Sequence, residues 1–149
     1  MVDELEALYR SRLPQFRRVA AAIAGDRDAG RDAVQEAFAT AIRKRRSYRG
    51  SGTLEAWVWQ IVVNAARDVR HRERPEPLTV LDPSANGHAP LLPLELLTER
   101  QREIVFLHYY ADLDYAAIAA ALAISPGTVG ATLNAARARL RQALQEVKT

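Results

Sequence analysis

Residues 115–140 constrain the fold of this chain more than any other segment. Apolar residues recur at helical spacing over Tyr115–Leu122, which predicts a short helix. Ser125 and Pro126 follow closely, and a serine N-cap with proline at the first helical position favours the start of another helix. Arginines continue along that second helix. Two short helices joined by a tight turn, the second rich in arginine, predict a helix-turn-helix that binds duplex DNA.

Helical spacing of apolar residues extends over nearly the whole chain, and the sequence carries no convincing alternating strand pattern. In the N-terminal half this spacing predicts three long helices, at about Val2–Ala24, Ala29–Arg46 and Thr53–Arg74. Pro14 is placed to kink or divide the first of these helices. Phe38 and Ile42 are expected to face the core from the second helix, and Thr53 is expected to cap the third.

A segment rich in Pro, Asn, Gly and Ser interrupts the helical pattern between residues 75 and 93, as is typical of a flexible linker. Beyond it, helices are predicted at about Leu94–Leu97, Glu99–Tyr109, Tyr115–Leu122 and Pro126–Val147. The predicted fold class is therefore all-α. It has two small helical domains, at residues 1–74 and 94–149, joined by a flexible linker at residues 75–93.

Charge is distributed unevenly along the chain, although the net charge is only +3. Residues 41–75 carry nine basic and three acidic side chains. Residues 130–149 carry four basic side chains and one acidic side chain. The stretches 1–40 and 76–129 are acidic overall. Two basic blocks suit a two-point contact with a polyanion such as DNA. The alternative is that both blocks are solvated helix faces.

Composition argues against catalysis and against a metal site. The absence of cysteine excludes disulfides, thiolate metal sites and cysteine nucleophiles. His71, His88 and His108 are scattered without zinc-binding spacing, and no glycine-rich phosphate loop follows a strand. We therefore expect no catalytic residue, no metal and no cofactor. Because no apolar run is long enough to span a bilayer and the acidic start does not resemble a signal peptide, we expect a cytoplasmic protein without membrane insertion.

The predicted third helix carries a polar stripe beside its apolar face. The stripe consists of Gln60, Asn64, Arg67, His71 and Arg74. Trp57 lies at its edge, whereas Trp59 lies on the opposite flank and is expected mainly to pack. A tryptophan beside cations can stack on an unpaired base, and the adjacent loop with Tyr48 and Arg49 can admit a base turned out of its stack. The alternative is an ordinary solvated face with both tryptophans in the core.

The predicted second helix carries an acidic and amide patch. It consists of Asp28, Asp32, Gln35 and Glu36, which project from one side. Such a patch suits a basic protein surface better than it suits DNA. The alternative is an ordinary exposed helix face.

Six segments in series resemble the sigma-70 family, in its extracytoplasmic-function group. Gly25–Phe38 and Tyr48–Asp68 are similar to region 2 of that family. The segments similar to region 4 are Leu97–Val105, Leu113–Ala119, Gly127–Val129 and Arg137–Leu140. The resemblance covers nearly the whole chain apart from the linker, and the two halves occur in the order that the family shows.

This resemblance implies a promoter-specificity subunit of bacterial RNA polymerase, with core polymerase and promoter DNA as partners. It implies that Asp32, Gln35 and Glu36 dock on the polymerase, that region 2 opens the −10 element and that region 4 binds the −35 element. The candidate DNA-binding residues are Tyr48, Arg49, Trp57, Gln60, Asn64, Arg67, His71, Ser125, Thr128, Ala131, Asn134, Arg137 and Arg141. Family members are often held inactive by an anti-sigma factor, and the flexible tether is compatible with such a partner.

Two departures from the family pattern affect function. Arg31 places a positive charge beside the acidic patch, where the family usually has an acidic residue. The outer face of the predicted recognition helix is poor in functional groups, because only Asn134 on it can make a bidentate contact with a base. Arg137 and Arg141 flank this face and are better placed for phosphates. We therefore expect region 4 to bind DNA weakly and region 2 to carry most of the promoter choice.

The sequence is also compatible to different degrees with three other classes of protein. A stand-alone helix-turn-helix regulator requires a dimer interface or a sensor domain, and the N-terminal half resembles neither. A degenerate sigma-like protein that acts as an interaction module is compatible with the plain recognition helix. An enzyme is the least favoured class, because Asp112 and Asp114 lie in a helix–helix turn, where such residues typically cap helices.

Overall fold

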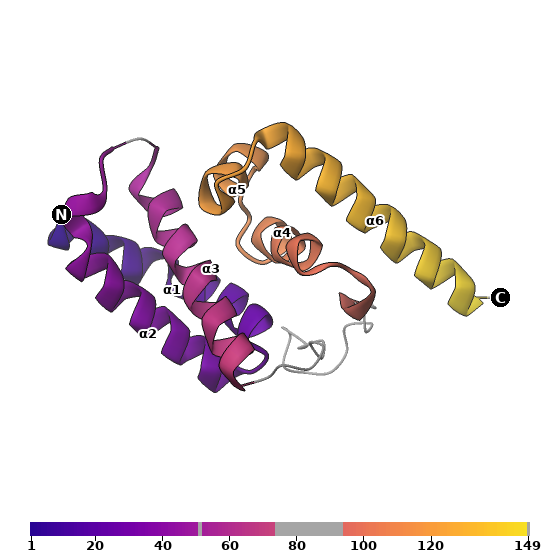
Figure 1. The fold of residues 1–149 in the computed structure, drawn as a ribbon, viewed down its shortest axis with the longest axis horizontal. Coiled ribbons are helices and arrows are strands. Elements are labelled where there is room, and N and C mark those ends of the chain that lie inside the picture. Colours follow the sequence, from indigo (N-terminus) through magenta and orange to yellow (C-terminus); the bar gives the residue numbers. More distant parts are fainter. Residues whose placement is uncertain (51, 74–93, 149) are drawn as a thin grey trace.

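The regular elements of the computed structural model are all helical in residues 1–50, 52–73 and 94–148, the part of the chain that it describes (Figure 1). The elements are α1 Val2–Ala24, α2 Arg27–Arg43, the 3₁₀ turn η1 Arg45–Ser47, α3 Leu54–Glu73, the 3₁₀ turn η2 Leu94–Leu96, α4 Glu99–Tyr109, α5 Tyr115–Leu122 and α6 Pro126–Lys148. The predicted all-α class is confirmed. The predicted linker lies outside the described residues, as do Arg74 and His88.

Helices α1, α2 and α3 form the N-terminal bundle (Figure 1). Aromatic rings lie in its core. The ring of Phe16 lies 4.4 Å from that of Trp59 and 5.4 Å from that of Phe38, measured between centroids. All three side chains are at most 7% exposed, so Trp59 packs in the core as expected. Pro14 does not divide α1, because the helix continues from Val2 to Ala24 with the proline on its exposed side.

The prediction for the second helix was wrong at both ends. Helix α2 starts at Arg27 because the Asp26 side chain accepts a hydrogen bond from the backbone N–H of Ala29, at 2.7 Å. It ends at Arg43, where the chain tightens into η1. Ile42 therefore lies in the last turn and is 42% exposed, whereas Ala41 completes the buried face.

Close contact between α1 and α2 depends on a glycine. A Cβ atom on Gly30 would lie 2.5 Å from the backbone Cα of Ala21, a separation that real atoms do not tolerate. Gly30 thus allows the two helix backbones to approach directly, a role that helical periodicity alone does not reveal. Ala33, Ala37 and Ala41 continue the same small, buried face of α2.

Helices α4, α5 and α6 form the C-terminal body, and their ends are fixed by side-chain caps. Thr98 and Gln101 form a reciprocal capping box at the start of α4. Asp114 accepts a hydrogen bond from the backbone N–H of Ala117 at the start of α5. Ser125 Oγ accepts from the N–H of Thr128 at 3.1 Å in the first turn of α6. The predicted helix-turn-helix of α5 and α6 is therefore present.

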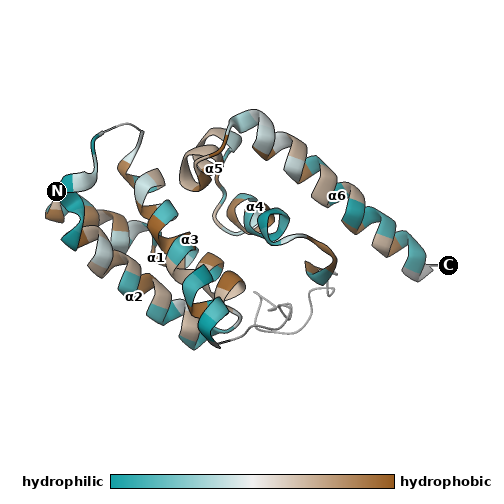
Figure 2. Cartoon of the chain, in the orientation of Figure 1, coloured by the Kyte–Doolittle hydropathy of each residue, from teal (hydrophilic) through white to brown (hydrophobic). Residues whose placement is uncertain are grey.

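The two units pack against each other, with α4 and α5 between the N-terminal bundle and α6 (Figure 1). Helix α5 lies along α3 and is apolar over most of its length (Figure 2). Helix α4 is covered on several sides, since the six consecutive residues from Arg102 to Leu107 are buried.

Within the described residues, no single helix is both long and apolar enough to cross a membrane. Helices α5 and α6 meet the length and composition criteria only as a pair, and they are bent by 104° at the break between them.

Candidate nucleic-acid interface

A pocket of about 210 Å³ lies at the start of α3. Four predicted DNA-binding residues line it: Tyr48, Arg49, Trp57 and Gln60. The rings of Tyr48 and Trp57 lie 5.5 Å apart, and Tyr48 Oη donates a hydrogen bond to the carbonyl of Gly52 at 2.7 Å. Thr53 Oγ1 accepts from the N–H of Ala56, which confirms the predicted cap of the third helix. The structure thus brings the loop and the half-buried Trp57 together around one opening.

Two glycines give the loop its shape. Gly50 and Gly52 have φ values of 77° and 106°, in the region that favours glycine. A Cβ atom on either would meet nothing within 4 Å. The backbone conformation, rather than crowding, is therefore what requires glycine at these two positions.

The pocket is not formed by the N-terminal bundle alone. Ala120 of α5 also lines it. Because Ala120 comes from the first helix of the helix-turn-helix, the C-terminal body covers part of the space beside Trp57.

Two members of the polar stripe of α3, Arg67 and His71, contact the C-terminal body. Arg67 donates through Nε and Nη2 to the two carboxylate oxygens of Glu103 on α4, in a paired, fork-like geometry. Glu103 is 2% exposed and Arg67 is 25% exposed. Asn64 Oδ1 accepts a further hydrogen bond from Arg67 Nη1, at 3.2 Å. The hydrogen bond with Glu103 raises the pKa of Arg67, and burial opposes that shift.

A second contact joins the same two helices one turn further along. His71 Nε2 lies 3.2 Å from Glu99 Oε1. That oxygen is shielded from solvent and makes no hydrogen bond within the described residues, so a proton on His71 Nε2 would satisfy it. Thus Arg67 and His71, both predicted to bind DNA, are opposite carboxylates of α4.

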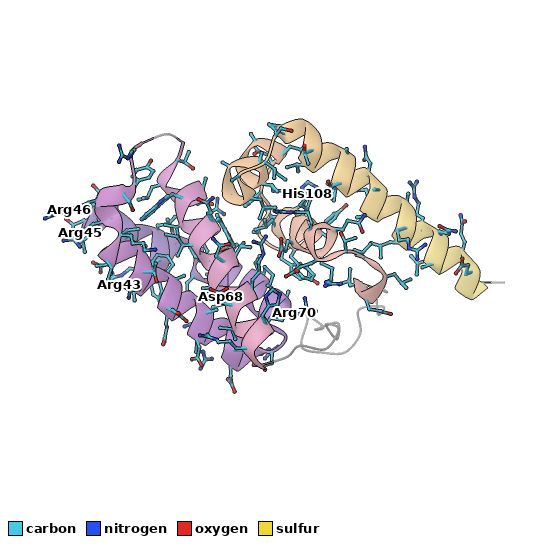
Figure 3. The ribbon with its side chains drawn as sticks, in the orientation of Figure 1. Arg43, Arg45, Arg46, Asp68, Arg70 and His108 are labelled. Carbon is cyan, nitrogen blue, oxygen red and sulfur yellow. The ribbon has the colours of Figure 1, made fainter. Side chains whose placement is uncertain are left out.

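Sequence reasoning missed the charged residues of α4. Arg102 Nη1 donates to the carbonyl of Leu97 at 2.7 Å, and its pKa is lowered first by burial and then by the nearby charge of Arg70. Arg70, labelled in Figure 3, is 8% exposed. It lines a cavity of about 10 Å³ together with Arg102 and Glu103. The available signal was that Arg102 and Glu103 directly precede four apolar residues, a pattern typical of a helix buried on most sides.

The outer face of α6 is exposed, as predicted. Gly127, Ala131, Asn134, Ala135 and Ala138 are all exposed, whereas Val129, Leu133 and Ala136 are buried. The Oγ of Ser125 and the Oγ1 of Thr128 lie 2.8 Å apart. Gly130 is half-buried. A Cβ atom added at this position would lie 3.2 Å from the Tyr115 ring. Gly130 therefore lies beneath that ring rather than on the open face of α6.

Arg137 is oriented by an aromatic residue of α4. Its Nε donates to Tyr109 Oη at 2.9 Å, and its guanidinium carbon lies 5.8 Å from the Tyr109 ring centroid. The hydrogen bond with Tyr109 raises the pKa of Arg137. Arg141 is exposed one turn further along. The structure therefore places two cations beside the face that carries Asn134.

The acidic patch lies on the outer surface of α2, away from the pocket. Asp32, Gln35 and Glu36 are all exposed. A surface hollow of about 490 Å³ extends from Asp32 to the N-cap Asp26. Glu36 Oε2 lies 4.0 Å from Arg72 Nη2 on α3. The patch is open to a large partner.

A basic cluster, which the sequence analysis counted only as part of a charge block, lies at the end of α2. It consists of Arg43, Lys44, Arg45 and Arg46, and its labelled arginines project away from the C-terminal body (Figure 3). Arg43 donates to Thr40 Oγ1 and Arg45 donates to the carbonyl of Ile42. The cluster directly precedes Ser47 and Tyr48 at the pocket.

Comparisons with known proteins agree with this arrangement. The family model described as Sigma-70 region 2 matches residues 8–76, and the model described as Sigma-70, region 4 matches residues 94–140. The chain is 28% identical to an RNA polymerase sigma-E factor of Streptomyces coelicolor, over 96% of this chain and 87% of that protein. It is 29% identical to the RNA polymerase sigma-E factor of Streptomyces avermitilis, over 97% of this chain and 87% of that protein.

Two solved structures share the fold over the full arrangement of helices. One is the sigma factor RpoE of Bartonella quintana, solved with the anti-sigma factor NepR, with a TM-score of 0.74 at 24% identity over 96% of this chain and 98% of that one. The other is CnrH, solved with the cytosolic domain of CnrY. It has a TM-score of 0.76 at 21% identity, over 100% of this chain and 92% of that one.

Proposed function

Because this chain belongs to the sigma-70 family, in its extracytoplasmic-function group, we propose that it binds core RNA polymerase and starts transcription at promoters that it selects through two separate surfaces. Residues 1–74 form region 2 and read the −10 element, residues 94–149 form region 4 and bind the −35 element, and residues 75–93 join them. The observation that carries this proposal is the pocket of Tyr48 and Trp57 at one end of a polar and cationic stripe.

The pocket is proposed to take one base turned out of the −10 duplex. Its volume of about 210 Å³ suits a single base, and an aromatic wall gives stacking with any base. Trp57 supplies that stacking surface, Gln60 and Arg49 supply polar groups at the wall, and the stripe of Asn64, Arg67 and His71 follows the strand. The basic cluster of Arg43–Arg46 directly precedes the pocket residues Ser47 and Tyr48 in the chain and is proposed to neutralise neighbouring phosphates.

Polymerase binding is assigned to the acidic patch on α2. Asp32, Gln35 and Glu36 present two carboxylates and an amide on an uncovered helix surface, which complements a basic partner surface. Arg31 lies next to this patch and weakens the attraction.

Region 4 is proposed to add affinity rather than selectivity. Ser125 and Thr128 lie at the amino end of α6, where backbone N–H groups attract a phosphate. Arg137 and Arg141 contact phosphates beside them. Ala131 offers only a methyl group to a thymine, and Asn134 offers the one bidentate contact, of the kind made with adenine.

Run-off transcription tests this proposal. Core polymerase without its own sigma factor is mixed with the chain and with a library of templates randomised at the −10 and −35 positions. We expect transcripts that start at defined sites, with more sequence information at −10 than at −35. The matched variant Asp32→Arg should abolish transcripts and co-purification with core, because it reverses one charge of the docking patch. A wild-type chain that binds core and starts no transcript would reject the proposal.

The remaining assignments follow from this role. The chain acts in the cytoplasm, where transcription takes place, and it is a regulator rather than an enzyme. An anti-sigma factor is proposed as a partner, because RpoE and CnrH have the same fold and the solved structure of RpoE contains one. Affinity purification of the tagged chain before and after inducing stress, followed by mass spectrometry, tests for this partner.

A further inference from the structure

The hydroxyl groups at the pocket beside Trp57 are already engaged with the backbone of the chain. Ser47 Oγ and Tyr48 Oη donate to backbone carbonyls, at 2.5 Å and 2.7 Å. Thr53 Oγ1 accepts from a backbone N–H as the cap of α3. These three side chains therefore shape the loop and the start of the helix, and their hydrogen-bonding groups are largely used up by that task.

Two other polar side chains that line the pocket are unengaged. Within the described residues, neither Gln60 on α3 nor Arg49 in the loop makes a hydrogen bond or an ion pair. Gln60 has an acceptor oxygen and N–H donors side by side, whereas Arg49 has donors alone. Gln60 is also the only lining side chain with an amide or carboxylate oxygen. It is thus the group best able to tell one base from another.

Gln60 lies next to the ring on which a base is proposed to stack. It follows Trp57 by three residues on α3, so the two side chains are neighbours on one side of the helix, and both line the pocket. A base that stacks on Trp57 through its face presents its donors and acceptors at its edge, towards the groups beside the ring. Gln60 is half-buried there, where a mismatched polar group cannot simply turn to bulk water.

We propose that Gln60 determines which base the pocket takes, and that this base is adenine. The proposal rests on the proposed function and adds the identity of the base. The adjacent N–H and C=O of a glutamine match the N7 acceptor and the N6–H donor of adenine in a bidentate contact. Arg49, which only donates, is left for a phosphate of the same strand.

The other bases fit these groups less well. Guanine leaves a polar group unpaired on either edge, because O6 and N7 are both acceptors and N1–H and N2–H are both donors, opposite a single amide. Cytosine and thymine do carry an adjacent donor and acceptor, but their smaller ring covers less of the Trp57 ring. An A·T pair also has fewer hydrogen bonds to break than a G·C pair when its base is turned out.

Replacing the amide with a carboxylate should invert the choice between the purines. In Gln60→Glu both side-chain oxygens accept hydrogen bonds and neither donates. They match N1–H and N2–H of guanine, whereas the N7 of adenine loses its donor. Gln60→Met keeps about the same side-chain length and has no amide, so it should remove the choice without creating another.

Run-off transcription with core polymerase and the library randomised at −10 tests this proposal. Sequencing the transcribed templates gives a ratio between bases at each position, which is independent of the overall activity. We expect wild type to favour adenine over guanine about 10- to 100-fold at one −10 position. Gln60→Glu should favour guanine there, and Gln60→Met should lower the ratio to about twofold or less, with the other positions unchanged.

The matched control is Gln145→Glu, which makes the same chemical change at an exposed position near the end of α6. It should keep the wild-type base ratios at every −10 position. Circular dichroism and co-purification with core polymerase check that each variant folds and docks. Should Gln60→Glu fail either check, Gln60→Met decides the outcome through the loss of the adenine preference.

Three outcomes would overturn the proposal. The first is a set of base ratios that is the same in wild type and in the Gln60 variants. The second is a wild-type preference for a base other than adenine at the position that these variants change. The third is the same change in Gln145→Glu. In each case a wild-type chain that starts transcripts at defined sites leaves the proposed function standing, whereas one that binds core and starts none rejects both.

Discussion

The two proposed DNA-binding surfaces differ in both chemistry and exposure. The surface on α3 carries an aromatic pocket, amides and basic side chains, of which Arg67 and His71 face carboxylates of the C-terminal body. The surface on α6 is open to solvent, but it offers mainly alanine and glycine around Asn134. The region proposed to discriminate between sequences is thus the one that the C-terminal body partly covers. The open region is proposed to make mainly weak and general contacts, because few of its side chains can read a base.

The largest effect is expected from the packing of α1 against α2 in the N-terminal bundle. Gly30→Ala should lower the free energy of unfolding by about 2–3 kcal/mol, because the new Cβ would overlap the backbone of Ala21 and α1 and α2 would have to separate. Urea denaturation followed by circular dichroism measures this change.

The matched control is Gly130→Ala on α6, where the neighbour is the edge of the partly exposed Tyr115 ring. That ring can move by a few tenths of an ångström, and alanine favours the helix, so we expect a gain of about 0.5 kcal/mol. Equal destabilisation by the two variants would contradict this difference in packing between the two regions.

The next largest effect is expected at the pocket. Trp57→Ala should reduce run-off transcription about 10- to 100-fold, because it removes the ring on which the displaced base is proposed to stack. Trp57→Phe keeps an aromatic face and should recover most of the activity. Binding to core polymerase, measured by native gel, should be the same for both variants. Full activity of Trp57→Ala would remove the pocket from the mechanism.

A smaller effect is expected beside α6. Arg137→Ala should weaken binding to a −35 duplex a few-fold, and to the same extent for every sequence. The slope of the logarithm of the binding constant against the logarithm of the salt concentration should become shallower by about one unit. Tyr109→Phe removes the oxygen that holds Arg137 and should have a weaker effect of the same kind. A change in sequence preference in either variant would show that Arg137 reads bases.

The smallest effect is expected at Asn134. Asn134→Ala should change transcription about threefold or less at any promoter of the randomised library, which is below the effect of a well-formed bidentate base contact. A larger, adenine-dependent loss would mean that α6 reads sequence after all, and the contrast between the two regions would then disappear.

Much of the architecture was predictable because its signals are local. Ser125, Asp114 and Thr53 act as caps in the structure, and hydroxyl or carboxylate groups at such positions indicate helix starts within a few residues. The end of α2 was misplaced because helical spacing continues to Arg46, whereas the chain tightens into η1 after Arg43. Ile42, in the last turn of α2, is exposed rather than packed in the core.

The candidate site was predictable only in part. The polar stripe and the neighbourhood of Tyr48 and Trp57 follow from periodicity and chain proximity. The DNA-binding and polymerase-binding roles of these residues stay predictions. Glu103 was not found, because its partner Arg67 lies 36 residues away on another helix, and helical periodicity carries no information about which faces of two bodies meet.

The sequence by itself determined the helices, most of their caps, the helix-turn-helix and the membership of a family, since each depends on residues close together in the chain. Only the tertiary structure decided that Glu103 is buried against Arg67, that Ala120 lines the pocket beside Trp57 and that Gly30 lies on the backbone of Ala21. The physical reason is that these contacts depend on how helices distant in sequence are placed relative to one another, and the free energy of a charged pair depends on the water that this placement excludes.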